Sequence, residues 1–178
     1  MHNDIDEILI TQEQIQARVR ELGREISGAY AGQELTLVAV LRGAIVFLAD
    51  LCRNIHLPVQ VDFMVVEKIR DGDGQAAVKI IKDLDKNIEG KHVLVIEDII
   101  DEGRTLAYLL ENLKLREPAS LKVVTIFDKP HQRATTIEAD YVGFGIPDRF
   151  VVGYGLDFKQ GYRHLGCLGV LKEAVATG

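Results

Sequence analysis

The sequence lacks the features that mark a disulfide-rich, fibrous or repetitive protein. It has no tryptophan, four prolines and two cysteines in 178 residues. Cys52 and Cys167 lie far apart and form no C-x-x-C motif, so they indicate reduced thiols of a cytosolic protein rather than a disulfide framework. No internal repeat, linker or low-complexity segment interrupts the chain.

Charge and hydropathy exclude two further classes of protein. The net charge is -6 and the pI about 5.4, so no basic surface for nucleic acid is indicated. The longest apolar runs are far shorter than a membrane span, and the acidic start at residues 1–7 is no signal peptide. With 47% hydrophobic and 27% charged residues, residues 1–178 are predicted to form one globular, cytoplasmic domain.

The stretch from residue 92 to 106 organises the rest of the chain. Residues 93–96 are an apolar run, which predicts a strand buried on both faces of a parallel sheet. Gly103 follows a few residues later, and leucines at helical spacing then run from Leu106 to Leu113. Between strand and glycine lie three carboxylates, Glu97, Asp98 and Asp101.

This strand, acidic loop and helix start predict a site for a ribose phosphate. Ligands of open α/β sheets lie outside the carboxyl ends of the strands. Backbone N–H groups near Gly103 and at the helix start suit a phosphate, while Glu97 and Asp98 suit two vicinal hydroxyls or a hard cation. The alternatives are an ordinary acidic turn, and a metal-binding strand of a nucleotide hydrolase. No G-x-x-x-x-G-K-[ST] motif supports the second.

A second anion site is predicted at the same sheet edge. A buried strand at Leu35–Leu41 runs directly into Arg42-Gly43 and then a helix at Ala44–Asn54. Gly43 lets the backbone approach a ligand and Arg42 adds a fixed positive charge. Taken alone, such a glycine is more often structural.

The remaining elements follow from periodicity and turn residues. Thr11 and Gln14 form a capping box for an amphipathic helix that ends near Gly28 to Gly32. Glu67–Ala77, with Asp71-Gly72-Asp73-Gly74, is predicted to be a loop. Further strands are predicted at Pro58–Val66, Val78–Ile81, Leu121–Phe127, Ala139–Phe144 and Phe150–Tyr154.

Glu97–Thr105 resembles the phosphoribosyl-pyrophosphate (PRPP) motif of type I phosphoribosyltransferases, most closely their hypoxanthine-guanine branch. Tyr141–Asp157 is similar to that branch over its whole length, and the resemblance runs from Thr36 to Leu165. It implies an α/β fold, in which a mainly parallel central sheet is flanked by helices and a small hood is built from terminal segments. The implied reaction joins hypoxanthine or guanine to PRPP, giving IMP or GMP and pyrophosphate.

The resemblance also implies a role for individual residues. Asp101 is the candidate general base toward purine N7. PRPP is expected on Glu97, Asp98, Asp101, Glu102, Gly103, Arg104 and Thr105. Pyrophosphate is expected on Leu41, Arg42, Gly43 and Arg163, with a non-proline cis peptide between Leu41 and Arg42. The purine is expected on Lys129, Phe150, Val151 and Asp157, and Mg²⁺ on Glu97, Asp98 and Asp157.

Three residues, in two segments, depart from the family pattern. Lys68-Ile69 stands where the family carries a Ser-Tyr pair in its mobile lid, so Lys68 or Arg70 is the hypothetical replacement. Glu102 stands where the family often has Thr or Ser, and its side chain is expected to turn outward.

Two rival functions remain open at this point. A PRPP-sensing regulator that binds nucleic acid is disfavoured by the acidic balance, and a transferase for another base is disfavoured by Lys129 with Phe150-Val151. No nucleic-acid or membrane partner is expected. The chain is expected to assemble as a homodimer or homotetramer.

Overall fold

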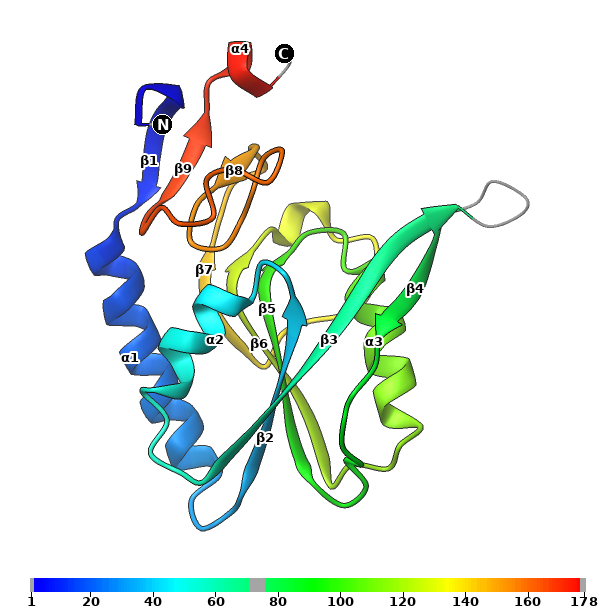
Figure 1. Ribbon diagram of the computed structural model, residues 1–178. Coiled ribbons are helices and arrows are strands. Elements are labelled where there is room, and N and C mark those ends of the chain that lie inside the picture. The colour runs from blue at the N-terminus through cyan, green and yellow to red at the C-terminus, as the bar shows by residue number, and fades with distance from the viewer. Residues whose placement is uncertain (1, 71–75, 177–178) are drawn as a thin grey trace.

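A six-stranded sheet forms the centre of the molecule (Figure 1). The computed structural model describes residues 2–70 and 76–176. The strands of this sheet are β2 (Leu35–Leu41), β3 (Val59–Arg70), β4 (Ala76–Lys82), β5 (His92–Ile100), β6 (Ser120–Asp128) and β7 (Tyr141–Gly145). They lie in the order β4-β3-β2-β5-β6-β7, and every neighbouring pair is parallel except β3 with β4. The mainly parallel central sheet is confirmed.

Helices cover both faces of this sheet, so its middle strands are buried on both sides (Figure 1). Alternate residues of β2 from Leu35 to Ala39 share a core with α1 (Gln12–Ala29) and α2 (Ile45–Cys52). Val38 and Val40 point the other way, into a core with α3 (Arg104–Lys114). This two-sided burial is why β2 and β5 read as continuous apolar runs.

The strand order places the two predicted anion sites side by side. After β2 the chain passes through α2 to β3 on one side, and after β5 it passes through α3 to β6 on the other. β2 and β5 are direct neighbours, so their connections diverge at a topological switch point, the usual ligand site of an open α/β sheet. Arg42-Gly43 and the segment after Ile100 both start there.

A second, three-stranded sheet forms a hood from the two ends of the chain (Figure 1). β1 (Ile5–Ile10) and β8 (Val151–Val152) both pair antiparallel with β9 (Leu168–Leu171). The predicted hood is confirmed. The short helical segments are η1 (His2–Asp4), η2 (Pro130–Gln132) and α4 (Glu173–Ala176). No helix in the described part of the chain is long and apolar enough to cross a bilayer.

Several sequence-based boundaries hold and others are wrong. The capping box is confirmed: the Gln14 amide donates to Thr11 Oγ1 at 3.3 Å and the Thr11 amide donates to Gln14 Oε1 at 2.8 Å. The predicted loop over Glu67–Ala77 is wrong at both ends, because β3 extends to Arg70 and β4 starts at Ala76. The turn over residues 71–74 lies outside the described residues. The strand predicted over Phe150–Tyr154 shrinks to two residues.

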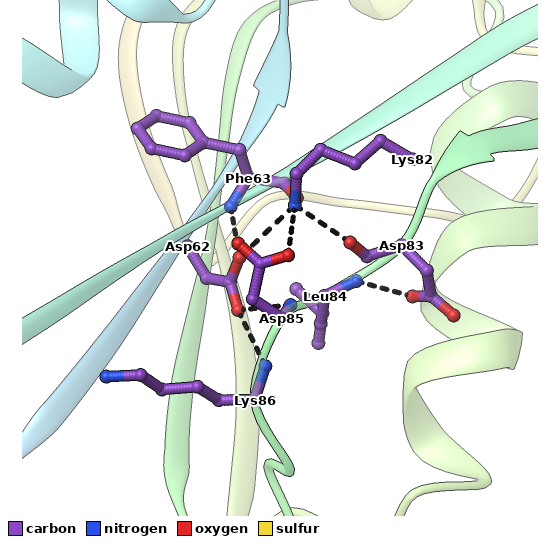
Figure 2. Close-up of polar contacts among 7 residues, drawn as sticks. All are labelled: Asp62, Phe63, Lys82, Asp83, Leu84, Asp85 and Lys86. Atoms are coloured by element: carbon purple, nitrogen blue, oxygen red, sulfur yellow. Dashed lines mark hydrogen bonds and ion pairs between the residues drawn. The ribbon is translucent and has the colours of Figure 1, made fainter.

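A buried carboxylate fixes the base of the β3–β4 hairpin (Figure 2). Asp62 accepts hydrogen bonds from the amides of Phe63, Asp85 and Lys86 at 2.7, 2.9 and 3.3 Å. Lys82 Nζ lies 3.7 Å from Asp62 Oδ1 and donates to the Phe63 carbonyl at 3.1 Å. Because these contacts tie the end of β4 to β3, the hairpin projects from a fixed base.

Candidate active site

A cleft of about 270 Å³ lies at the carboxyl end of β5. It is lined by Val40, Lys68, Glu97, Ile99, Ile100, Asp101, Glu102, Gly103, Arg104, Thr105 and Leu106. Gly103 is the N-cap of α3 and has a φ of 81°, a left-handed conformation that glycine adopts without strain. The helix start therefore opens toward the cleft, where its free N–H groups favour an anion.

The side chain of Glu102 turns outward as expected. It is 54% exposed, and its Oε2 lies 3.3 Å from Nε of Arg104, itself 66% exposed. The ion pair partly neutralises the carboxylate at the edge of the phosphate loop, which lowers its repulsion toward an incoming anion.

Two adjacent acids lie deep at the β5 end. Burial raises the pKa of Glu97 well above its ordinary 4.5, and the neighbouring Asp98 charge raises it further. Burial also raises the pKa of Asp98 to about 6, opposed by the hydrogen bond from the Ile99 amide and by the Arg163 charge. Both residues lie within β5 rather than in a loop, because β6 pairs with β5 as far as Ile100. Two acids held close in low dielectric favour a cation or a hydrogen-bond donor beside them.

Glycines bring the second anion loop against this acidic pair. The Leu41–Arg42 peptide is cis, which confirms the expectation for this loop. A Cβ atom on Gly43 would overlap Asp98 Oδ2, and one on Gly155 would overlap the Gly43 carbonyl oxygen. Three segments that are distant in sequence thus meet only because these two positions carry no side chain.

Two arginines converge next to Gly43. Arg42 Nη1 and Arg163 Nη2 each donate to the same Gln160 side-chain oxygen, both at 3.3 Å. Arg163 Nη2 also pairs with Asp157 Oδ1 at 2.7 Å, and the Gln160 amide donates to Asp157 Oδ2 at 3.0 Å. Two guanidinium groups so close repel each other, so a polyanion between them would be stabilised.

A second hollow, of about 210 Å³, adjoins the first at Ile99 and Asp101. It is lined by Asp98, Ile99, Asp101, Lys129, Phe150, Val151, Leu156, Asp157 and Arg163. Phe150 is 51% exposed, and its ring meets the edge of Phe158 at 5.6 Å between centroids. Lys129 is buried, with Nζ 3.6 Å from Asp148 Oδ1, too far for a hydrogen bond. This hollow therefore combines an aromatic face with a cationic donor.

The predicted site residues come together in these two hollows and the arginine pair beside them. Leu41, Arg42 and Gly43 line neither hollow. Arg42 and Gly43 reach the site through Gln160 and Asp98, and Leu41 takes part only through its cis peptide with Arg42. Sequence reasoning missed Gln160, because its partner Arg42 is 118 residues away. It also missed Arg133, which donates to the Asp101 carbonyl at 2.8 Å and pairs with Asp128. The only sequence signal for Arg133 is its place four residues after Lys129.

Comparison with known proteins decides the family. The family model described as "Phosphoribosyl transferase domain" matches residues 5–159. The chain belongs to the phosphoribosyltransferase family. It is similar to the hypoxanthine-guanine phosphoribosyltransferases of Bacillus subtilis and Streptococcus thermophilus, at 48% and 47% identity over 176 residues that cover 98% of each chain. It is also 49% identical to the bifunctional TilS/HprT protein of Listeria innocua, of whose length it spans 27%.

Solved structures of this family match the fold closely. A hypoxanthine phosphoribosyltransferase from Staphylococcus aureus superposes with a TM-score of 0.96 at 45% identity, covering 100% of this chain and 97% of the other. The Trypanosoma cruzi enzyme, solved in complex with the product IMP, gives a TM-score of 0.91 at 38% identity, covering 98% of both chains. The sheet, helices and hood are those of the type I phosphoribosyltransferase fold.

The acidic residues of this site fit a hard cation that shares ligands with a bound polyanion. Glu97, Asp98 and Asp157 supply oxygen donors, and the Asp98 pKa responds to the charge on Asp157. Within residues 2–70 and 76–176, however, no three such side chains form a ready-made metal cluster. Mg²⁺ is commonly held by one or two carboxylates plus substrate phosphates, so this donor set suits Mg²⁺ brought with a polyphosphate.

We expect Asp98→Asn to stabilise the metal-free protein at neutral pH. The folded pKa of about 6 exceeds the ordinary 3.8, so between these values the folded state binds more protons than the unfolded state. Stability from this group is therefore lost as pH rises through that window, and the neutral amide avoids the loss. In EDTA, Asp98→Asn should melt higher than the unaltered protein by roughly 3 °C or more at pH 8. The gap should shrink toward pH 4.5, and a gap that is constant with pH would contradict the assignment.

Proposed function

We propose that this chain transfers the 5-phosphoribosyl group of PRPP to N9 of hypoxanthine, and of guanine, giving IMP or GMP and pyrophosphate. The observation that carries the proposal is the pair of hollows that meet at Asp101, one at a helix start and one with an aromatic face and a lysine. A purine nucleotide has the same layout, with a phosphate at one end, a base at the other and ribose between. The names of the bacterial relatives and the bound IMP of the Trypanosoma cruzi enzyme support this choice of nucleotide.

In this proposal the phosphoribosyl group lies along the first hollow. The backbone N–H groups of the loop from Asp101 to Thr105 hold the 5′-phosphate, helped by the dipole of α3. Glu97 and Asp98 accept hydrogen bonds from the ribose hydroxyls. The C1–O bond breaks toward a cationic, oxocarbenium-like ribose, so negative charge beside the sugar stabilises the transition state more than the ground state.

The base occupies the second hollow. Lys129 donates to the purine 6-oxo group, the ring of Phe150 stacks on the base, and the Val151 backbone binds its edge. Asp101 lines both hollows, which supports its assignment as the general base toward purine N7. Asp157 completes the wall of this hollow.

The leaving pyrophosphate is assigned to the cis loop and the paired arginines. Leu41, Arg42 and Gly43 offer backbone and a guanidinium, and Arg163 adds a second guanidinium through the shared Gln160. Glu97, Asp98 and Asp157 are the residues that would hold Mg²⁺, which when bound neutralises pyrophosphate charge.

The proposal also covers domain organisation, cellular compartment, nucleic-acid binding and oligomeric state. Residues 1–178 act as one domain, since the purine hollow takes lining residues from both the main sheet and the hood strand β8. The two described cysteines are free thiols, which suits the cytoplasm. No nucleic-acid partner is proposed for so acidic a chain. Assembly as a homodimer or homotetramer stays a prediction, which sedimentation checks.

One assay tests the proposed function. Purified protein is given PRPP and Mg²⁺ with hypoxanthine, guanine, xanthine, adenine or orotate in turn, and pyrophosphate release is measured. Release with hypoxanthine and guanine, and little with adenine or orotate, is the expected result. Release with adenine at an equal rate, or with no base at all, would contradict it. If the chain were instead a nucleic-acid-binding regulator, it would be retained on heparin at low salt and inactive in this assay.

Lys68 is the candidate for the contact that replaces the family's Ser-Tyr pair. It lies on β3, in a hairpin with a fixed base, and its side chain lines the phosphate cleft. The Arg70 side chain lies outside the described residues, so that alternative stays a prediction. A lysine donating to phosphate forms a charge-assisted hydrogen bond in place of two neutral ones.

We expect Lys68→Ala to lower kcat/KM for PRPP about tenfold or more, since such a bond contributes roughly 1.5–3 kcal/mol. PRPP is varied at saturating hypoxanthine. Lys79→Ala is the matched control, because Lys79 is exposed on the neighbouring strand β4 opposite Glu67, away from the cleft. A loss below twofold in Lys68→Ala would show that the side chain makes no such contact, and Arg70→Ala would then test the alternative.

A further inference from the structure

Three consecutive residues brace the phosphate loop from outside the cleft. Arg133 follows η2, and its guanidinium Nη1 donates to the Asp101 carbonyl at 2.8 Å. The Ala134 amide donates to the Glu102 carbonyl at 2.9 Å, and Thr135 Oγ1 reaches the same oxygen at 3.4 Å. The carbonyls of both residues that precede Gly103 are thus held by the segment 133–135.

Gly103 itself packs against this brace. A Cβ atom on Gly103 would lie 2.5 Å from Thr135 Oγ1 and 3.1 Å from Arg133 Cδ. Arg133 and Thr135 line a separate hollow, together with Asp128 and Pro130, and neither lines the phosphate cleft. The brace and the cleft therefore lie on different sides of the loop.

The orientation of the carbonyls fixes the orientation of the amides. In a trans peptide the C=O and the following N–H point in opposite directions. Within the described chain the only cis peptide is Leu41–Arg42, so the two peptides that follow Asp101 and Glu102 are trans. With both carbonyls turned toward Arg133 and Ala134, the N–H groups of Glu102 and Gly103 turn the other way, toward the cleft. Amides presented in this way are what an anion requires.

Arg133 also joins this loop to the purine side. Arg133 Nη2 pairs with Oδ1 of Asp128, the residue next to Lys129, and the Arg133 side chain is 13% exposed. The planar guanidinium bridges two partners at once, which the single ammonium of a lysine does not reproduce. Asp128 lies at the end of β6 and is fixed by its strand pairing with Ile100 and Gly145. The Arg133 side chain therefore fixes the position of the phosphate loop relative to the central sheet.

We propose that Arg133 is a positioning residue: it holds the Glu102 amide toward the 5′-phosphate of the substrate, while Ala134 and Thr135 hold the Gly103 amide beside it. This inference rests on the proposed function, and deepens it by naming what orients the phosphate site. Arg133 touches neither base nor phosphate; it acts through the Asp101 carbonyl.

The test compares the phosphate side with the base side of the reaction. Arg133→Lys keeps a positive charge facing Asp128 but gives up the second hydrogen bond. It should raise KM for PRPP about tenfold, while KM for hypoxanthine changes less than threefold and the melting temperature stays close to that of the unaltered protein. Arg116→Lys is the matched control: Arg116 pairs with Asp83 at 2.8 Å beyond the far end of α3, and both KM values should be unchanged.

Each remaining outcome contradicts either the proposed function or the role of Arg133. If the unaltered protein releases no pyrophosphate with any purine, the proposed function fails. If it is active and Arg133→Lys leaves KM for PRPP within twofold, or raises both KM values equally, the inference alone is overturned. Should Arg133→Lys not fold, Thr135→Val removes only the hydroxyl near the Glu102 carbonyl. It must then raise KM for PRPP selectively, by at least about twofold, or the inference is likewise overturned.

Discussion

Asp101→Asn is expected to leave PRPP affinity nearly intact and to lower kcat by about 10²–10⁴, the usual range for the loss of a general acid–base group. Asp101 lines both hollows, and Arg133 donates to its backbone carbonyl. The backbone from which the Asp101 side chain extends is therefore held where the two hollows meet. Asparagine keeps the shape but accepts no proton at neutral pH. Because the group is needed only when the purine loses its proton, the effect falls on kcat.

Steady-state kinetics with both substrates varied, together with equilibrium binding of PRPP, separate the two effects. Asp83→Asn is the control, since Asp83 is half exposed and pairs with Arg116 away from the site. A fall in kcat of less than threefold in Asp101→Asn would reduce Asp101 to a structural role. Loss of PRPP binding together with kcat would place its carboxylate on the ribose instead.

Lys129→Ala is expected to abolish much of the selection for a 6-oxopurine. A buried donor that faces an amino group is left unpaired, and sites built on such a hydrogen bond discriminate by roughly 10⁴-fold. Lys129 is 8% exposed and makes no close hydrogen bond through its ammonium to Asp148, so its donors are available to the base. Removing it should raise KM for hypoxanthine by about 10–100-fold and change PRPP affinity less.

The measurement is kcat/KM for hypoxanthine and for adenine in the unaltered protein and the variant. Lys122→Ala is the control on the same strand, because Lys122 lies over Tyr30 and Tyr141 near the opposite end of β6. If the ratio of hypoxanthine to adenine kcat/KM were the same with and without Lys129, another group would have to select the base.

Buried parallel strands were the part of the fold that the sequence predicted best. Leu35–Leu41 is recovered residue for residue, because burial on both faces demands an unbroken apolar run. The hood strands β1 and β9 carry no such signal: they pair across more than 150 residues, from Ile5 with Leu171 onward, and three consecutive residues of β1 are exposed. Their pairing is a tertiary effect that local pattern does not report.

In the β3–β4 hairpin, too, strand residues were missed. Two Asp-Gly steps predict a loop, yet the flanking residues pair as strands, Glu67 with Lys79 and Ile69 with Ala77. Turn residues mark a reversal of the chain but not how far pairing extends on either side of it. The acidic pair was misplaced for a similar reason, since only the neighbouring strand β6 keeps Glu97 and Asp98 within β5.

In the candidate site, the residues that could be predicted are those whose own type and local sequence position already indicate a role. Carboxylates after a strand, a glycine at a helix start and a lysine at a strand end can each be read locally. Gln160, Arg133 and Gly155 act through partners on distant segments: Arg42, the Asp101 carbonyl and the Gly43 carbonyl. Their roles depend on which loops the sheet order brings together, and a single sequence does not encode that in any local pattern.

A crystal structure of this chain with IMP bound tests the central claim most directly. We expect the 5′-phosphate to accept hydrogen bonds from backbone amides between Glu102 and Thr105, the 6-oxo group to accept one from Lys129 Nζ, and the base to lie on the Phe150 ring. A phosphate bound between Arg42 and Arg163 instead, or a base outside the hollow of Lys129 and Phe150, would contradict it.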